Sequence, residues 1–141
     1  MTSLPSPHGI GSLGNEAYRF IDFLKAAGQR FWQILPVGPT GCGDSPYQSV
    51  SAFAGNPYLI DLDLLAERGL LRPEEIAGVS FGDDPDSVDY GALFQNRFAV
   101  LCLAAERFRP GEDYGAFARE NADCRTTRCS WRSRRKMVWR R

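Results

Sequence analysis

The chain has 141 residues, of which 43% are hydrophobic, 24% charged and 12% aromatic. This balance is typical of a folded globular domain and excludes disordered, collagen-like and coiled-coil chains. The longest uninterrupted apolar run, Phe98–Ala105, is much shorter than a membrane span of about 18 residues. Residues 1–14 are broken by prolines and glycines and do not resemble a secretion signal. We therefore expect a cytoplasmic protein with no membrane partner.

The net charge of zero conceals an uneven distribution along the chain. Residues 1–123 hold 9 basic and 17 acidic side chains, a balance of −8, whereas residues 124–141 hold 8 basic and no acidic ones, a balance of +8. Such a basic tail is either an arm that binds nucleic acid or another anionic surface, or a segment that does not belong to the fold.

Residues 1–14 are predicted to form a loop because prolines and glycines punctuate them. The run Gly9–Gly14 matches the dinucleotide-binding pattern G-x-G-x-x-G. However, Pro5 and Pro7 exclude the central strand that must precede this pattern. The segment is therefore predicted to be an entry loop to a helix, and no nucleotide cofactor is expected.

A helix followed by a buried strand is predicted next. The helix runs from Asn15, a suitable N-cap residue, to Gly28, which suits a left-handed C-terminal cap. Phe31–Pro36 is then short and almost wholly apolar, as strands buried on both faces of a parallel sheet are. This arrangement predicts an α/β fold.

A long connection of about 25 residues follows the strand, and connections of more than about 12–15 residues are usually functional or disordered. Its aromatic residues favour an ordered loop, and loops after the carboxyl ends of strands bind ligands in α/β folds. Downstream, helices are predicted over Leu62–Arg68 with Asp61 as cap, from Pro73, over Tyr90–Phe108 and from Tyr114. The helix over Tyr90–Phe108 is expected to bury an apolar face made of Tyr90, Phe94, Phe98, Leu101, Ala105 and Phe108, widened by Leu93 and Val100.

Four cysteines, Cys42, Cys102, Cys124 and Cys129, form neither a disulfide framework nor a metal motif. Only Cys124 and Cys129 are close in sequence, and no histidine follows them at zinc-finger spacing. No metal site is expected.

Several stretches of the sequence closely resemble the 4-α-glucanotransferases, a family also called amylomaltase or disproportionating enzyme. They are the three runs Trp32–Gly41, Gly43–Gln48 and Ser51–Ile60, together with the opening Leu4–Pro7 and Gly9–Gly11. The resemblance covers residues 2–123. It implies the N-terminal portion of a (β/α)8 barrel, incomplete and with helical insertions, in which Phe31–Pro36 is an early strand. A closed barrel of this kind needs about 250 residues.

The resemblance also implies a reaction, the transfer of a 1,4-α-glucan segment to an acceptor glucose or oligosaccharide with retention at the anomeric carbon. Retaining chemistry needs two carboxyl groups about 5 Å apart, and in this family these groups lie on later barrel strands. None of them maps onto residues 1–123, so no catalytic residue is assigned and no cofactor is expected. The aspartates at 61, 63, 83, 84 and 86 are interpreted as helix caps and solvated surface.

The part of the sugar site that the resemblance places in this chain is the loop around Tyr47. A tyrosine ring suits the apolar face of a pyranose, and Ser45 and Asp44 supply compact polar partners. We therefore predict that Tyr47, Ser45 and Asp44 bind 1,4-α-glucans and maltooligosaccharides; the alternative is that Tyr47 only packs the loop. Cys42 stands where the family often has a tyrosine associated with a secondary glucan contact, and His8, expected to be exposed, stands where an aromatic residue is common.

These observations predict two segments: residues 1–123 form part of a catalytic barrel, and residues 124–141 form an unstructured basic tail. Codons permitted for Arg125–Trp139 can be chosen so that a shifted frame encodes an amphipathic helix similar to the family's continuation. A single-base shift near codon 124, with an early stop, is therefore our hypothesis for the tail, and a nucleic-acid arm is the rival. The chain is interpreted as a truncated glucanotransferase, inactive alone; a non-catalytic glucan-binding fragment and a non-functional product are the alternatives.

Overall fold

The computed structural model describes residues 1–41, 44–49, 51, 54–84 and 86–121. The basic tail 124–141, Cys42 and Phe53 lie outside these residues. Met1–Val37 and Asn56–Phe108 form one compact unit, and a second unit contains Gly38–Gly55 and the last described helix. No helix of the described ranges is long and apolar enough to cross a membrane.

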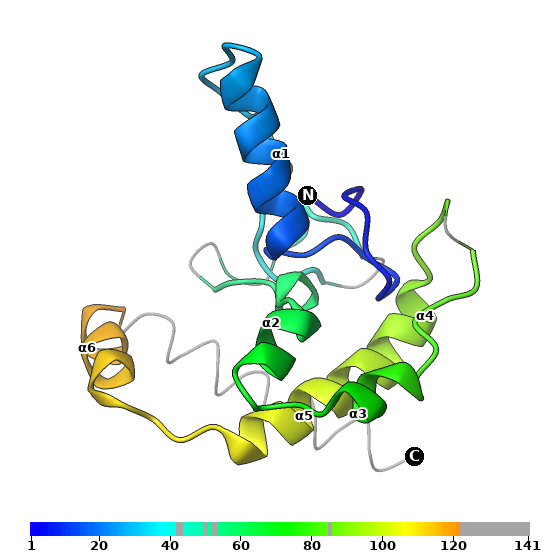
Figure 1. Ribbon diagram of the computed structural model, residues 1–141, viewed down its shortest axis with the longest axis vertical. Helices are drawn as coiled ribbons and strands as arrows, with labels where there is room; N and C mark the ends of the chain where they lie inside the picture. The colour runs from blue at the N-terminus through cyan, green and yellow to red at the C-terminus, as the bar shows by residue number, and fades with distance from the viewer. Residues whose placement is uncertain (42–43, 50, 52–53, 85, 122–141) are drawn as a thin grey trace. The chain divides into compact units, whose positions relative to one another are not determined.

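The regular elements of the described residues are all helical (Figure 1). In chain order they are α1 (Asn15–Ala26), the 3₁₀ turn η1 (Pro57–Leu59), α2 (Leu62–Glu67), α3 (Pro73–Ala77), α4 (Tyr90–Ala92), the π turn η2 (Leu93–Arg97), α5 (Phe98–Arg107) and α6 (Glu112–Glu120).

The strand predicted at Phe31–Pro36 is not formed among the described residues, so the structure shows only the helical part of the predicted α/β fold. A strand needs a neighbouring strand to take up its N–H and C=O groups, and no second strand is present among the described residues. The apolar run is exposed instead of buried: the exposed fraction of Phe31 is 91%, and that of Leu35 is 51%.

The predicted helix boundaries are mostly confirmed, because each depends on a local contact. The Asp61 side chain accepts the Leu64 N–H at 2.9 Å and so caps α2. Pro73 is the first residue of α3. Gly28 follows α1 with a φ of +72°, the left-handed conformation that glycine adopts without strain. The predicted Asn15 cap is wrong: Gly14 occupies the N-cap position, without a side-chain bond, and Asn15 is already helical.

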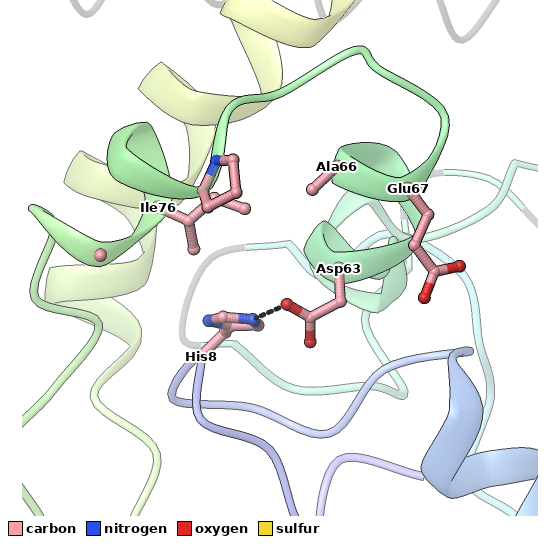
Figure 2. Close-up of a pocket in the computed structure, with 7 residues that line it drawn as sticks. His8, Asp63, Ala66, Glu67 and Ile76 are labelled. Carbon is pink, nitrogen blue, oxygen red and sulfur yellow. Dashed lines mark hydrogen bonds and ion pairs between the residues drawn. The ribbon is translucent and has the colours of Figure 1, made fainter.

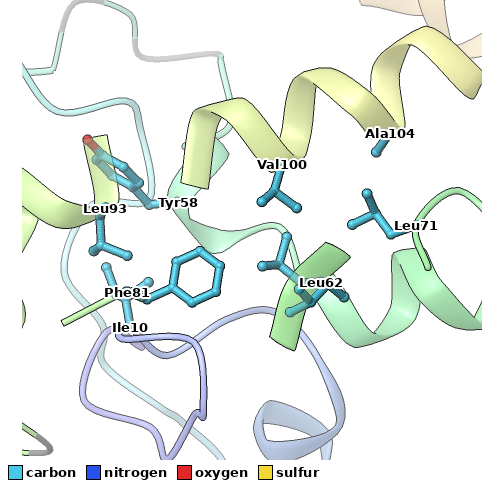
Figure 3. Close-up of a cluster of buried hydrophobic side chains, with 9 residues drawn as sticks. Ile10, Tyr58, Leu62, Leu71, Phe81, Leu93, Val100 and Ala104 are labelled. Carbon is cyan, nitrogen blue, oxygen red and sulfur yellow. The ribbon is translucent and has the colours of Figure 1, made fainter. Parts of the chain in front are cut away.

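The hydrophobic core lies in the first unit, between the N-terminal segment, α2, α3 and the α4–α5 helix (Figure 3). Leu62 and Leu93 are fully buried in it. The other buried members of this core are Ile10, Tyr58, Leu71, Ile76, Phe81, Val100 and Ala104. Tyr58 contacts the Phe98 ring edge-on, with the centroids 5.4 Å apart.

The helix predicted over Tyr90–Phe108 is formed, but as three consecutive elements, α4, η2 and α5. Its most buried residues are Leu93, Arg97, Val100 and Ala104. The predicted face is therefore centred one position too far along the chain: Tyr90, Phe98 and Leu101 pack against the core, whereas Phe94, Ala105 and Phe108 are exposed. The apolar pattern alone did not show that Arg97 belongs to the buried row.

An ion pair joins α3 to the end of α5. Arg107 donates to both carboxylate oxygens of Glu75 at 2.6 Å and to the Leu70 carbonyl at 3.2 Å. The hydrogen bond from Arg107, followed by that from the Arg72 N–H, lowers the pKa of Glu75 to about 2. Fork-like pairing of this kind fixes the direction of both side chains.

In the second unit, α6 begins at Glu112, two residues before the predicted Tyr114. The acidic residues Glu112 and Asp113 occupy its first turn and Arg119 its last. Charges of these signs at these two ends are favourable to a helix dipole.

Candidate functional site

The loop between Val37 and Asn56 is closed at its base by a hydrogen bond, and its two arms approach each other closely at two glycines. The Asn56 N–H donates to the Val37 carbonyl at 3.0 Å. A β-carbon at Gly38 would lie 2.5 Å from Ser49 Oγ, and one at Gly41 would lie 2.6 Å from the Gln48 carbonyl oxygen. These two positions therefore need glycine because the facing arm of the loop leaves no room for a side chain.

The three predicted sugar-binding residues share one tight turn. Asp44 has a φ of +53°, a left-handed conformation that aspartate tolerates better than most residues. The Ser45 carbonyl accepts the Gln48 N–H at 3.2 Å, and Ser45 Oγ accepts the Tyr47 N–H at 3.4 Å. Ser45 is thus engaged in holding the turn through both its main chain and its hydroxyl.

Tyr47 is 75% exposed, in contrast to the buried Tyr58. Its ring is therefore not packed into a hydrophobic interior, where it could not contact a ligand. An exposed ring held on a short turn presents an apolar face and a hydroxyl together, which suits the alternating C–H and O–H surface of a pyranose. Asp44 is the only carboxylate within the turn 44–48.

A second cluster lies in the first unit, around His8 (Figure 2). His8 is only 9% exposed, so the expectation of an exposed histidine is wrong. Its Nε2 lies 3.0 Å from Asp63 Oδ1, and its ring meets Phe81 edge-on at 5.7 Å. The pair borders a cavity of about 510 Å³ lined by His8, Asp63, Ala66, Glu67, Pro73, Ile76 and Ala77.

The two aspartates at the start of α2, Asp61 and Asp63, have structural partners. Asp61 caps α2 and also accepts a hydrogen bond from the Ser12 hydroxyl, while Asp63 bonds His8. Across the described ranges, no group of three or more His, Cys, Asp or Glu side chains is arranged to hold a metal ion. The interpretation of Asp61 as a helix cap is confirmed, whereas Asp63 has a partner that its place on a helix surface did not indicate.

Arg97 is a buried residue that no sequence pattern singled out. Its side chain is 0% exposed, Nη1 donates to the His8 carbonyl at 3.1 Å, and Nη2 donates to the Ile60 carbonyl at 2.7 Å. Among the residues that the structure describes, Nε finds no hydrogen-bond partner, and the guanidinium carbon lies 6.0 Å from the centre of the Phe81 ring. Burial lowers the pKa of Arg97 to about 10, against the opposing effect of Asp61 and Asp63.

Comparison with known proteins identifies the class to which this loop and helical unit belong. The family model described as 4-alpha-glucanotransferase matches residues 1–136, and the chain therefore belongs to the 4-alpha-glucanotransferase family. That match ends at residue 136, within the basic segment 124–141.

Individual relatives give the same result. The chain is 56% identical over 108 residues to the 4-alpha-glucanotransferase of Thermus thermophilus (77% of this chain, 21% of the relative). It is 51% identical over 124 residues to that of Streptococcus pneumoniae (86% and 25%). The amylomaltase of Streptococcus agalactiae, solved in complex with acarbose, superposes with a TM-score of 0.78 at 49% identity, over 84% of this chain and 25% of that one. The chain thus spans about a quarter of the length of the relatives it matches.

Proposed function

We propose that this chain is the part of a 4-α-glucanotransferase that presents the turn 44–48 to a 1,4-α-glucan. The observation that carries the proposal is the exposed Tyr47 ring on a turn held by Ser45. The solved amylomaltase that superposes on this chain was crystallised with acarbose, which supports an oligosaccharide as the ligand. In this proposal Tyr47 stacks on a glucose unit, and Ser45 and Asp44 offer polar contacts beside it.

The reaction of the whole protein is proposed to be retaining transfer of a glucan segment to a glucose or oligosaccharide acceptor. We place residues 1–123 in the catalytic barrel of that protein, with Phe31–Pro36 as one of its strands. The exposure of this apolar segment supports the assignment, because such a segment gains hydrogen bonds and burial when it joins a sheet. The basic segment 124–141 is proposed to derive from another reading frame, which resequencing of the gene would test.

The 141-residue chain is proposed to have no transferase activity of its own. Retaining transfer needs two carboxyl groups about 5 Å apart, whereas Asp61 and Asp63 are engaged with other groups of the fold. An assay of maltotriose disproportionation with the purified chain tests this point. Glucose release above that of a boiled sample would refute it.

Binding is tested by titrating the purified chain with maltoheptaose and comparing Tyr47→Ala with Tyr18→Ala. Tyr18 is a matched control because it is 60% exposed on α1, outside the loop. Loss of an aromatic stacking contact is expected to weaken binding about fivefold for Tyr47→Ala and not for Tyr18→Ala. Tyr47→Phe keeps the ring face and should retain most of the affinity. Equal affinities of the Tyr47→Ala variant and the parent chain would contradict the proposed function.

A further inference from the structure

The loop that carries Tyr47 leaves and re-enters the first unit through a short stem. At this stem the Asn56 N–H donates to the Val37 carbonyl at 3.0 Å. Asn56 is held in turn by the residues that follow it: its side-chain oxygen accepts the Tyr58 N–H at 3.0 Å, and its carbonyl accepts the Leu59 N–H at 3.0 Å. The position of Asn56, and with it the stem contact to Val37, therefore depends on how residues 56–60 are fixed.

Two contacts from distant parts of the chain fix those residues. The Leu13 N–H donates to the Leu59 carbonyl at 2.8 Å. Arg97 Nη2 donates to the Ile60 carbonyl at 2.7 Å, while its Nη1 donates to the His8 carbonyl at 3.1 Å. One guanidinium thus ties the N-terminal segment and the end of η1 to the middle of the long helix.

The surroundings of Arg97 indicate that this contact serves position more than stability. The side chain is fully buried, both of its hydrogen-bond partners are neutral carbonyls, and Nε has none. Asp61 and Asp63 act on it only as nearby charges. Taking a cation out of water is costly, and apolar side chains of similar volume often stabilise a core at least as well as buried charges do. A fork of donors, by contrast, can hold two separate carbonyls at a fixed spacing.

We propose that Arg97 is a positioning residue for the stem of the loop that carries Tyr47, acting by holding the Ile60 carbonyl and, through residues 56–60, the contact between Asn56 and Val37. The glucan part of this inference rests on the proposed function, whereas the effect on the stem does not. Arg97 makes no contact with the sugar in this proposal.

The experiment compares Arg97→Lys with Arg107→Lys in the full 141-residue chain. Arg107 is a matched control because it also donates to a backbone carbonyl, that of Leu70, but at the junction of α3 and α5. Amide exchange of Asn56, referred to the core amide of Val100 in the same variant, reports the stem separately from global stability. We expect Arg97→Lys to accelerate this relative exchange about tenfold and to weaken maltoheptaose binding. Arg107→Lys should leave both relative quantities as they are in the parent chain.

A second variant tests the stem while leaving Arg97 unchanged. Asn56→Ala deletes the side-chain bond to the Tyr58 N–H and is expected to weaken maltoheptaose binding as Arg97→Lys does. Equal relative exchange of the Asn56 amide in Arg97→Lys and Arg107→Lys would overturn the proposal. Binding that is insensitive to Tyr47→Ala would instead refute the glucan function, and the exchange result would still decide whether Arg97 holds the stem.

Discussion

Two neighbouring alanines on α5 provide a direct test of which face of that helix is buried. Ala104 is 4% exposed in the core, whereas Ala105, which the sequence pattern had placed on the buried face, is exposed. Substitution of each by glutamate adds the same side chain to adjacent positions. At Ala104 the added carboxylate would enter the apolar core, at an expected cost of about 3–5 kcal/mol. At Ala105 it would remain in water, and the change should stay within about 0.5 kcal/mol.

Urea unfolding followed by circular dichroism at 222 nm measures both changes on one scale. The whole stability of a domain of this size is about 5–15 kcal/mol, so Ala104→Glu should shift the midpoint strongly or abolish the folded baseline. Ala105→Glu should overlay the parent curve. If Ala105→Glu destabilised the protein as much as or more than Ala104→Glu, the register of α5 described here would be wrong.

Three further outcomes are expected. Arg107 holds the pKa of Glu75 at about 2, below its ordinary value of 4.5. The ionised carboxylate therefore stabilises the fold fully above about pH 4.5, and this contribution is lost as the pH falls through about 2. The melting temperatures of Glu75→Gln and of the parent chain should therefore converge as the pH is lowered from about 4.5 to about 2. Gly14→Ala should destabilise the protein by about 1–3 kcal/mol in urea unfolding, because a β-carbon there would overlap the Asp61 carboxylate. Phe31→Glu should reduce self-association in sedimentation velocity, because Phe31 is exposed on an extended apolar segment.

Each of these outcomes has a matched comparison. Glu74→Gln removes a neighbouring exposed carboxylate and should keep the pH dependence of the parent; the same convergence in both variants would contradict the role given to Glu75. Gly55→Ala adds a methyl group in open space and should be nearly neutral, so a cost equal to that of Gly14→Ala would count against the overlap. Phe31→Leu keeps an apolar side chain and should still self-associate.

The features that could be predicted from sequence are those that short-range contacts determine. Asp61 caps a helix that begins at the next residue, through a bond to an N–H three positions on. Pro73 opens α3, and Gly28 follows α1 in a left-handed conformation. In each case the residue type and a few neighbours contain the physical cause. The N-cap of α1 was misassigned by one residue because Gly14 supplies the extended backbone there without a side-chain bond.

The features that could not be predicted depend on distant partners. The two hydrogen bonds of the buried Arg97 join it to carbonyls that lie 89 and 37 positions away in the sequence. No local pattern indicates which carbonyls will face a given arginine. His8 is buried by Asp63 and Phe81 in the same way. The apolar run Phe31–Pro36 has the composition of a strand, but composition does not supply the neighbouring strand that its backbone needs.

The candidate site falls between these two cases. The turn that carries Asp44, Ser45 and Tyr47 is local, and its residues were identified by resemblance to a family that the comparisons confirm. The exposure of Tyr47 could not be derived from the sequence, since a tyrosine in a loop packs inward about as readily as outward. The stem contact between Asn56 and Val37 and the hydrogen bond from Arg97 to Ile60 join residues far apart in sequence, and no local pattern indicates either of them.

The π turn Leu93–Arg97 makes the long helix tolerant of losing one residue at this point. A turn of this kind contains one residue more than an α-helical turn needs. Deleting one residue within it would restore regular α-helical bonding and leave the residues beyond it facing nearly as before. Deleting Ala99 in α5, by contrast, would rotate the two parts of the helix by about 100° relative to each other about the helix axis. Val100 and Ala104 would then turn away from the buried face that carries Leu93 and Arg97.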